Sequence, residues 1–252
     1  MDIDVLFDPF GARWSQVHIA AVAAEDAGLD GIWLYDHLAG SVHGASHVLE
    51  CWTVLTAIAA SVPRIKVGSM VLNVANRDPG TLAVMAATLQ HVSDGRLLLG
   101  VGAGGGRELP YAHEQYALGR DVPGDQVRRA HVERTITTLR EVWTGSIGGV
   151  GGFLRPDPPP PIIVGAFGPK LAEVAGRLAD GINLPGGPQL PSLLQVARDA
   201  HERAGKDPAA FVVTVSSDGS ARDLERLADL GVDRAVVFAR PPYLDTIDAL
   251  RR

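Results

Sequence analysis

The sequence predicts one (β/α)8 barrel, a TIM barrel, that takes up the whole chain of 252 residues. Two observations predict it. Short apolar runs with β-branched residues alternate eight times with longer segments of helical period, which is the pattern of successive βα units. The composition, 46% hydrophobic and 21% charged, is that of a globular protein with a sizeable core. Barrels of this kind often have this length as one undivided domain.

In the first half of the chain, four apolar runs each precede a helical segment. The expected strands are residues 3–7, 31–35, 65–72 and 96–101, and the expected helices are residues 16–27, 48–60, 80–92 and 126–143. Gly28 stands where the first helix needs a C-cap, and Pro79 stands near the start of the third helix. The local signals at the joints therefore agree with the periodicity.

The second half continues the same pattern. The expected strands are residues 162–165, 181–184, 211–215 and 234–238, and the expected helices are residues 169–178, 192–204, 221–230 and 243–250. Pro169 and Pro191 stand near helix starts, and Gly231 is placed as a C-cap. Eight units without a sign of reversed topology favour a closed barrel over an open sheet.

Two segments interrupt the alternation. Residues 103–125 form a long loop after the fourth strand, and the Gly/Pro-rich stretch TGSIGGVGGFLRPDPPPP (144–161) is inserted before the fifth. The second segment has the composition of an interdomain linker. Because the same pattern of strands and helices continues beyond it, we predict a single domain over residues 1–252.

Charge and composition exclude several classes of partner. The net charge is −6 and no run of Lys and Arg stands out, so we expect no nucleic-acid partner. The N-terminus is acidic and breaks at Pro9, unlike a signal or transit peptide, and no apolar run reaches the roughly 20 residues of a membrane-spanning helix. Cys51 is the single cysteine, so no internal disulfide can form. We therefore expect a cytoplasmic protein.

Binding and catalytic residues of such barrels lie on the loops that follow the carboxyl ends of the strands. The stretch GIWLYDHL (31–38) places Asp36 and His37 at the end of the second strand, where an imidazole can exchange protons near neutral pH. The alternative is that the pair only caps the strand end or makes a polar contact there. The third strand ends in small and polar residues, which is also the pattern of a simple turn.

Two glycine-rich segments favour ligand binding. The run GRLLLGVGAGGG (95–106) ends the fourth strand, and the three glycines after Ala103 would let a flat ligand or its anionic chain approach the backbone, although a flexible turn has the same pattern. In IIVGAFGPKLAEVAGRLADGIN (162–183), Gly165 ends a strand, Gly168 lies in a tight turn and a helix begins near Pro169. The free N–H groups of that helix start suit a phosphate. The segment is neither a P-loop nor a GxGxxG fingerprint.

A metal site is not expected. His43 and His47 have the i, i+4 spacing of a helical metal pair, but no acidic or cysteine partner accompanies them. Paired carboxylates of the glycosidase type and a Gly-x-Ser-x-Gly nucleophile turn are not evident.

Several motifs together resemble the bacterial-luciferase-like monooxygenase superfamily. They are DGIWLYDH, IKVGSMVLN, RDPGTLAVMAATLQHVSDGRLLLGVGAG, LREVWTG and PIIVGAFGPKLAEVAGRLADGIN, in this order over roughly residues 1–205. Within the superfamily they look closest to oxidoreductases that use the deazaflavin coenzyme F420. The resemblance implies a TIM barrel whose mouth holds a flavin or deazaflavin, a homodimer, and a separate reductase that regenerates reduced cofactor. The tail from Lys206 is shorter than is usual in the family.

The resemblance also implies site residues. Those expected to touch the ring or ribityl chain are Asp36, Asn73, Ala103 and Gly104. Those expected to hold the phosphate are Phe167, Gly168, Lys170 and Leu171, mainly through backbone N–H groups. Met70-Val71 falls where the family has a non-proline cis peptide that forms a bulge behind the ring.

His37 falls on the active-site histidine of the glucose-6-phosphate dehydrogenase branch, so it is the predicted proton donor or acceptor. The chain departs from that branch in two places. Gly105 stands where the branch has a catalytic glutamate, and LPGGP (184–188) replaces sugar-phosphate ligands. The prediction is therefore an F420-dependent oxidoreductase that transfers a hydride between the deazaflavin and an unidentified small organic substrate.

Three alternatives stay open at this point. The chain could be an FMN-dependent monooxygenase that uses reduced flavin and O2, a non-catalytic flavin-binding protein, or an unrelated TIM-barrel enzyme that acts on a phosphorylated substrate.

Overall fold

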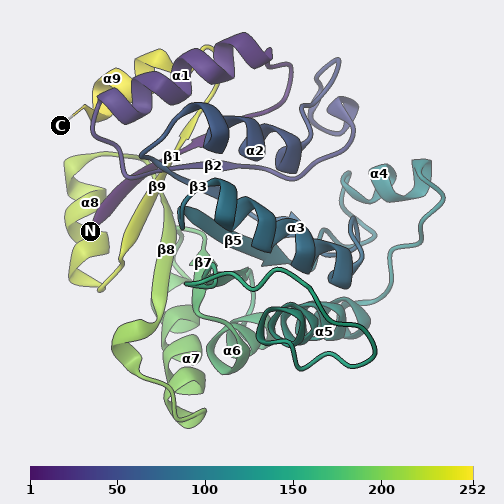
Figure 1. Ribbon diagram of the computed structural model, residues 1–252. Coiled ribbons are helices and arrows are strands. Elements are labelled where there is room, and N and C mark those ends of the chain that lie inside the picture. The colour runs from purple at the N-terminus through teal and green to yellow at the C-terminus, as the bar shows by residue number, and fades with distance from the viewer. Residues whose placement is uncertain (252) are drawn as a thin grey trace.

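The computed structural model describes residues 1–251, and its strands form one closed parallel barrel. The strand order is β3-β2-β1-β9-β8-β7-β6-β5-β4, and a further pairing between β3 and β5 closes the ring. Strands β3 and β4 are two short parts of one position in the barrel, so eight positions result. The predicted (β/α)8 barrel is confirmed. Figure 1 shows the first and last strands, β1 and β9, side by side, so the two ends of the chain close the barrel together.

The strands follow the predicted runs closely. Their bounds are β1 (Asp2–Phe7), β2 (Gly31–Leu34), β3 (Lys66–Ser69), β4 (Leu72–Asn73), β5 (Leu97–Gly102), β6 (Ile162–Gly165), β7 (Gly181–Leu184), β8 (Val212–Ser217) and β9 (Arg234–Ala239). The third expected strand, residues 65–72, is divided because the Met70-Val71 peptide is cis. The predicted cis bond is confirmed, and the split of the strand at this point was not expected.

Eight helices match the predicted ones to within three residues at either end. Their bounds are α1 (Trp14–Asp26), α2 (Cys51–Ser61), α3 (Pro79–Val92), α5 (Asp125–Thr144), α6 (Pro169–Leu178), α7 (Leu190–Arg203), α8 (Ala221–Asp229) and α9 (Leu244–Leu250). Three short helices were not predicted: η1 (Gly40–His43), α4 (Ala112–Ala117) and η2 (Pro208–Ala210). Helix α4 divides the segment 103–125 and lies outside the ring of barrel helices (Figure 1). Within residues 1–251, no helix combines the length and apolar character needed to cross a membrane.

The amino end of the barrel interior is filled by a charged and aromatic cluster. Arg234 donates from Nε and Nη2 to the two carboxylate oxygens of Asp4, at 2.7 Å each, and the indole Nε1 of Trp33 donates to Asp4 Oδ2 at 2.7 Å. All three side chains are buried. Gly68 makes room for the Trp33 ring, because a Cβ there would lie 2.5 Å from it. With this end closed, the carboxyl ends of the strands remain as the binding face.

Candidate active site at the carboxyl ends of the strands

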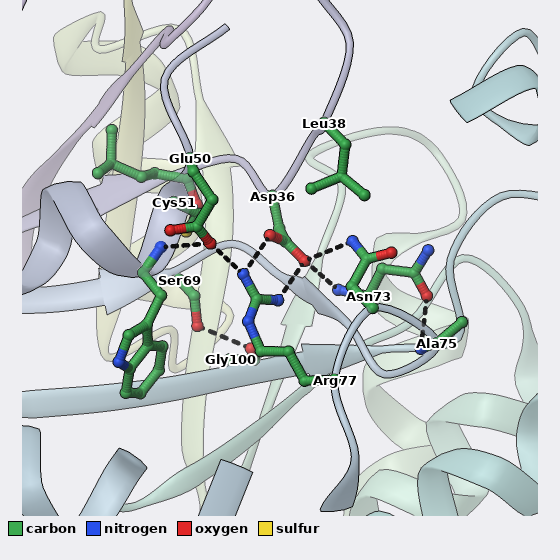
Figure 2. Close-up of polar contacts among 12 residues, drawn as sticks. Asp36, Leu38, Glu50, Cys51, Ser69, Asn73, Ala75, Arg77 and Gly100 are labelled. Atoms are coloured by element: carbon green, nitrogen blue, oxygen red, sulfur yellow. Dashed lines mark hydrogen bonds and ion pairs between the residues drawn. The ribbon is translucent and has the colours of Figure 1, made fainter. Parts of the chain in front are cut away.

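A buried carboxylate anchors the loop that follows β4. Asp36, just beyond β2, accepts hydrogen bonds from both terminal nitrogens of Arg77, at 2.8 and 2.9 Å. Its Oδ2 also accepts from the backbone N–H of Asn73 at 2.9 Å and from Asn76 Nδ2 at 3.1 Å. Figure 2 shows the Arg77 guanidinium between Asp36 and Glu50, with which it also pairs. The network fixes the ends of two neighbouring barrel positions against each other.

This network changes how Asp36 can act. Its side chain has 0% exposed surface, so the carboxylate cannot face a ligand directly in this arrangement. The predicted contact between Asp36 and a ring stays a prediction, but the geometry gives the residue an indirect role through Asn73 and Arg77. The alternative interpretation, that the aspartate makes a polar contact at a strand end, describes its surroundings well.

Glu50 links the same network to helix α2. Its carboxylate accepts from the N–H groups of Trp52 at 3.1 Å and Thr53 at 2.7 Å, so it caps the amino end of the helix. Burial alone raises the pKa of Glu50, but these N–H groups and the Arg77 guanidinium outweigh it, so the pKa lies below its ordinary value. Burial likewise lowers the pKa of Arg77, and the hydrogen bonds and charges of Asp36 and Glu50 outweigh that effect and raise it.

The imidazole of His37 is held by a glutamate that the sequence analysis missed. His37 Nδ1 lies 2.7 Å from Glu114 Oε1, and Glu114 Oε2 accepts from the backbone N–H of Leu38 at 2.6 Å. Glu114 is 3% exposed, while the His37 side chain keeps 20% of its surface exposed. Glu114 belongs to α4, in the long loop after β5. Nothing in its local sequence, AHEQYA, distinguishes it from Glu108 in the same loop.

Aromatic rings surround the same imidazole. The ring centroids of Tyr111, Phe10 and Tyr35 lie 4.6, 5.2 and 6.3 Å from that of His37. Burial, together with the nearby Asp8 carboxylate, raises the pKa of Tyr35 to about 12, so its hydroxyl stays protonated at neutral pH. These rings restrict the rotation of His37 and supply an apolar wall beside its exposed edge.

The bulge at Met70-Val71 explains the glycines that end β5 and β6. A Cβ on Gly102 would lie 2.5 Å from a methyl carbon of Val71, and one on Gly165 would lie 2.8 Å from the same methyl. A Cβ on Gly100 would lie 1.8 Å from the carbonyl oxygen of Ser69. At these positions the chain needs glycine to admit neighbouring protein atoms.

The next glycine of the run also packs against protein. Gly104 has a φ of +69°, and a Cβ there would lie 2.6 Å from the side-chain oxygen of Asn73. Arg128, from the first turns of α5, donates to the carbonyl oxygens of Ala103 and Gly104. The Nε of Arg128 is buried and has no hydrogen-bond partner within the described part of the chain. Ala103, Gly104 and Asn73 thus lie together, and their contact with a ring or ribityl chain stays a prediction.

The turn after β6 is open to solvent. Phe167 is 82% exposed, and Gly168 is the N-cap of α6, with Pro169 in the first turn. A Cβ on Gly168 would meet no other atom within 4 Å. Lys170 is exposed and Leu171 packs partly against the core. The turn therefore offers a free helix start with a nearby cation, an arrangement that suits an anionic group.

The predicted site residues form a continuous arc. They follow β2, the β3–β4 position, β5 and β6, which are neighbours in the closed sheet. His43 and His47 have other partners: the His43 ring lies tilted against that of Phe10, with centroids 4.9 Å apart, and His47 Nε2 lies 3.0 Å from the carbonyl oxygen of Ala12. In residues 1–251, no three histidine, cysteine or acidic side chains are grouped so that they could hold a metal ion.

Two relatives of similar sequence bear the same name, F420-dependent glucose-6-phosphate dehydrogenase. Over 208 residues the chain is 34% identical to an F420-dependent glucose-6-phosphate dehydrogenase of Nakamurella multipartita, which covers 76% of this chain and 59% of that protein. A protein of the same name from Microbacterium testaceum is 32% identical over 200 residues, covering 73% of this chain and 58% of that protein. The chain thus spans rather less than two thirds of the length of these relatives.

Solved structures share the fold over the whole chain. An F420-dependent secondary alcohol dehydrogenase, in complex with an F420-acetone adduct, superposes with a TM-score of 0.83 at 18% identity, covering 100% of this chain and 99% of that one. The coenzyme F420-dependent tetrahydromethanopterin reductase of Methanopyrus kandleri superposes with a TM-score of 0.77 at 16% identity, covering 100% and 97%. At these identities the likeness concerns the fold.

The family model described as luciferase-like monooxygenase matches residues 8–237. That range leaves out β1 and the last two residues of β9, and it includes the other strands and the whole arc of predicted site residues. The chain therefore belongs to the luciferase-like monooxygenase family.

Proposed function

We propose that this protein is an F420-dependent oxidoreductase that transfers a hydride between the deazaflavin and a small organic substrate. The observation that carries the proposal is the placement of His37, whose imidazole is fixed on one side by Glu114 and keeps an exposed edge at the carboxyl end of the barrel. Relatives at 34% and 32% identity are named as F420-dependent enzymes, and this supports the choice of cofactor.

The residues present fit such a cofactor. The turn at Phe167 and Gly168 is open, since a Cβ on Gly168 would meet no protein atom, and Lys170 adds a positive charge at the start of α6. This turn would hold the phosphate. The backbone at Ala103 and Gly104, the Asn73 side chain and the Met70-Val71 bulge would lie along the ring and its chain. Bound F420 would supply the carbon that accepts or donates the hydride.

The protein's own contribution is proton transfer and orientation. His37 would take the proton of a substrate hydroxyl, or return it to a carbonyl oxygen, at Nε2, because Nδ1 is occupied by Glu114. The rings of Phe10, Tyr35 and Tyr111 would exclude water from that side of the imidazole. Asp36, with Arg77, would hold Asn73 in place.

Titration with each cofactor tests the proposal. The purified protein is mixed with increasing F420 or FMN, and the absorbance and fluorescence of the cofactor are followed. Saturable binding of F420 with weaker binding of FMN is the expected result. Preferred binding of FMN would favour the monooxygenase alternative, and failure to bind either would favour an enzyme of another class. Tight F420 binding without turnover over a broad panel of alcohols and carbonyl compounds would favour a non-catalytic carrier.

We also propose a cytoplasmic homodimer that works with a separate reductase. The free, buried Cys51 fits a reducing compartment. Helix α1 exposes the apolar side chains of Trp14 (40% exposed) and Ile19 (59% exposed), which suits a contact with a second copy. Light scattering after size-exclusion chromatography measures the mass of the particle, and a monomeric mass would contradict the dimer.

A further inference from the structure

We infer that Glu114 is a positioning residue that sets which nitrogen of His37 carries the proton. The inference rests on the proposed function for its catalytic meaning, but its geometry stands independently of any cofactor. No motif in the sequence points to this residue, and it lies nine positions after Gly105, where the resembling branch has its own glutamate.

The carboxylate of Glu114 faces a backbone N–H group and an imidazole nitrogen at once. Oε2 accepts from the backbone N–H of Leu38 at 2.6 Å, and Oε1 lies 2.7 Å from His37 Nδ1. Burial of a carboxylate is costly unless it is paired and hydrogen-bonded, and at 3% exposure Glu114 has these two groups as its partners. An ionised carboxylate only accepts hydrogen bonds. His37 must therefore carry a proton on Nδ1.

This fixes the other side of the ring. With Nδ1–H directed at Glu114, the neutral imidazole has its lone pair on Nε2, which has no hydrogen-bond partner among residues 1–251. Nε2 is then a base ready to accept a substrate proton. When that proton moves from the substrate oxygen to Nε2, the Nδ1–H bond stays intact and the negative charge of Glu114 stabilises the resulting imidazolium. The reverse transfer returns the proton from Nε2.

The loop that carries Glu114 is held in place by its neighbour. Gln115 Nε2 donates to Asn76 Oδ1 at 2.8 Å, and Asn76 Nδ2 donates to Asp36 Oδ2 at 3.1 Å. Two consecutive residues of α4 therefore contact the segment after β2: Glu114 contacts His37 directly, and Gln115 is linked to Asp36 through Asn76. The long loop after β5 thus carries α4 to the carboxyl end of β2, where Glu114 contacts His37.

A Glu114→Gln substitution distinguishes positioning from packing. The side chain keeps its size, but an amide has one acceptor oxygen and one NH2 group in place of two acceptors. If the oxygen keeps the Leu38 N–H, the NH2 group faces His37 Nδ1, which can then accept only if its proton moves to Nε2. We expect the neutral form of His37 to change from the Nδ1–H to the Nε2–H tautomer.

The measurement is a long-range proton–nitrogen correlation spectrum of the full chain labelled with 15N-histidine, recorded without cofactor at a pH where the ring is neutral. His37→Ala identifies the signal by its loss. Glu108→Gln is the matched control, because it removes the same charge from an exposed position of the same loop. The expected spectra show Nδ1–H in the wild type and in Glu108→Gln, and Nε2–H in Glu114→Gln.

Two outcomes would overturn the inference. One is a spectrum in which the neutral His37 of the wild type is protonated on Nε2. This measurement needs no variant, so it tests the inference even if Glu114→Gln fails to fold. The other is a folded Glu114→Gln whose His37 keeps the wild-type pattern. Failure of F420 binding would remove the catalytic meaning of the tautomer without changing these spectra, so the two failures can be told apart.

Discussion

At the scale of the residue, His37 combines a fixed side and a free side. Glu114 and three aromatic rings restrain the imidazole, while 20% of its side-chain surface remains exposed. A restrained imidazole is a more effective acid or base than a mobile one, because its reacting nitrogen is already directed at the substrate. Asp36, its neighbour in sequence, is fully covered and holds the loop after β4. The two adjacent residues therefore differ in exposure and in partners.

Replacement of His37 separates proton transfer from cofactor binding. His37→Ala should lower turnover by about 10²–10⁴-fold, the usual contribution of a positioned acid or base, and leave F420 affinity largely intact. Single-turnover oxidation of reduced F420 by a substrate found in the panel is the measurement. A variant as fast as the wild type would make His37 a pocket-lining residue without a catalytic role.

At the scale of the element, helix α2 and the loop after β4 share one charge network. Glu50 caps the helix through two backbone N–H groups and also pairs with Arg77, which in turn holds Asp36. Loss of the Glu50 carboxylate at the start of α2 would therefore also remove one of the partners that hold Arg77 against Asp36. The same arrangement makes the stability of this region depend on pH.

The pKa of Glu50 lies below its ordinary value of 4.5, so its contribution to stability is present above that value and is lost as the pH falls through the folded-state pKa. We expect the free energy of unfolding of the wild type to fall more steeply below about pH 4.5 than that of Glu50→Gln. Urea unfolding at neutral pH and at several acidic pH values measures the difference. Parallel curves for the two proteins over the acidic range would contradict this account.

At the scale of the whole molecule, the chain order could be predicted because each strand and helix carries its own periodicity. All eight pairs were found, and the ends moved by only a few residues. What could not be predicted depends on contacts distant in sequence. His37 and Glu114 are 77 positions apart, and the atoms that require glycine at positions 100 and 102 come from the bulge at residues 69–71. The cis peptide itself followed from the family resemblance, since no proline marks it.

The central claim is that F420 binds at the carboxyl end of the barrel with its phosphate on the turn after β6. Gly168→Val tests it most directly, because a Cβ there meets no other atom within 4 Å and the φ of −158° suits any residue, so we expect the fold to be kept. Gly148→Val, in the segment before β6, is the control, since a Cβ there also meets nothing within 4 Å.

Fluorescence titration with F420 gives the dissociation constant of each protein. We predict that Gly168→Val weakens binding by about 1–3 kcal/mol, roughly five- to 150-fold, while Gly148→Val binds as the wild type does. An unchanged affinity in a folded Gly168→Val protein would contradict the account.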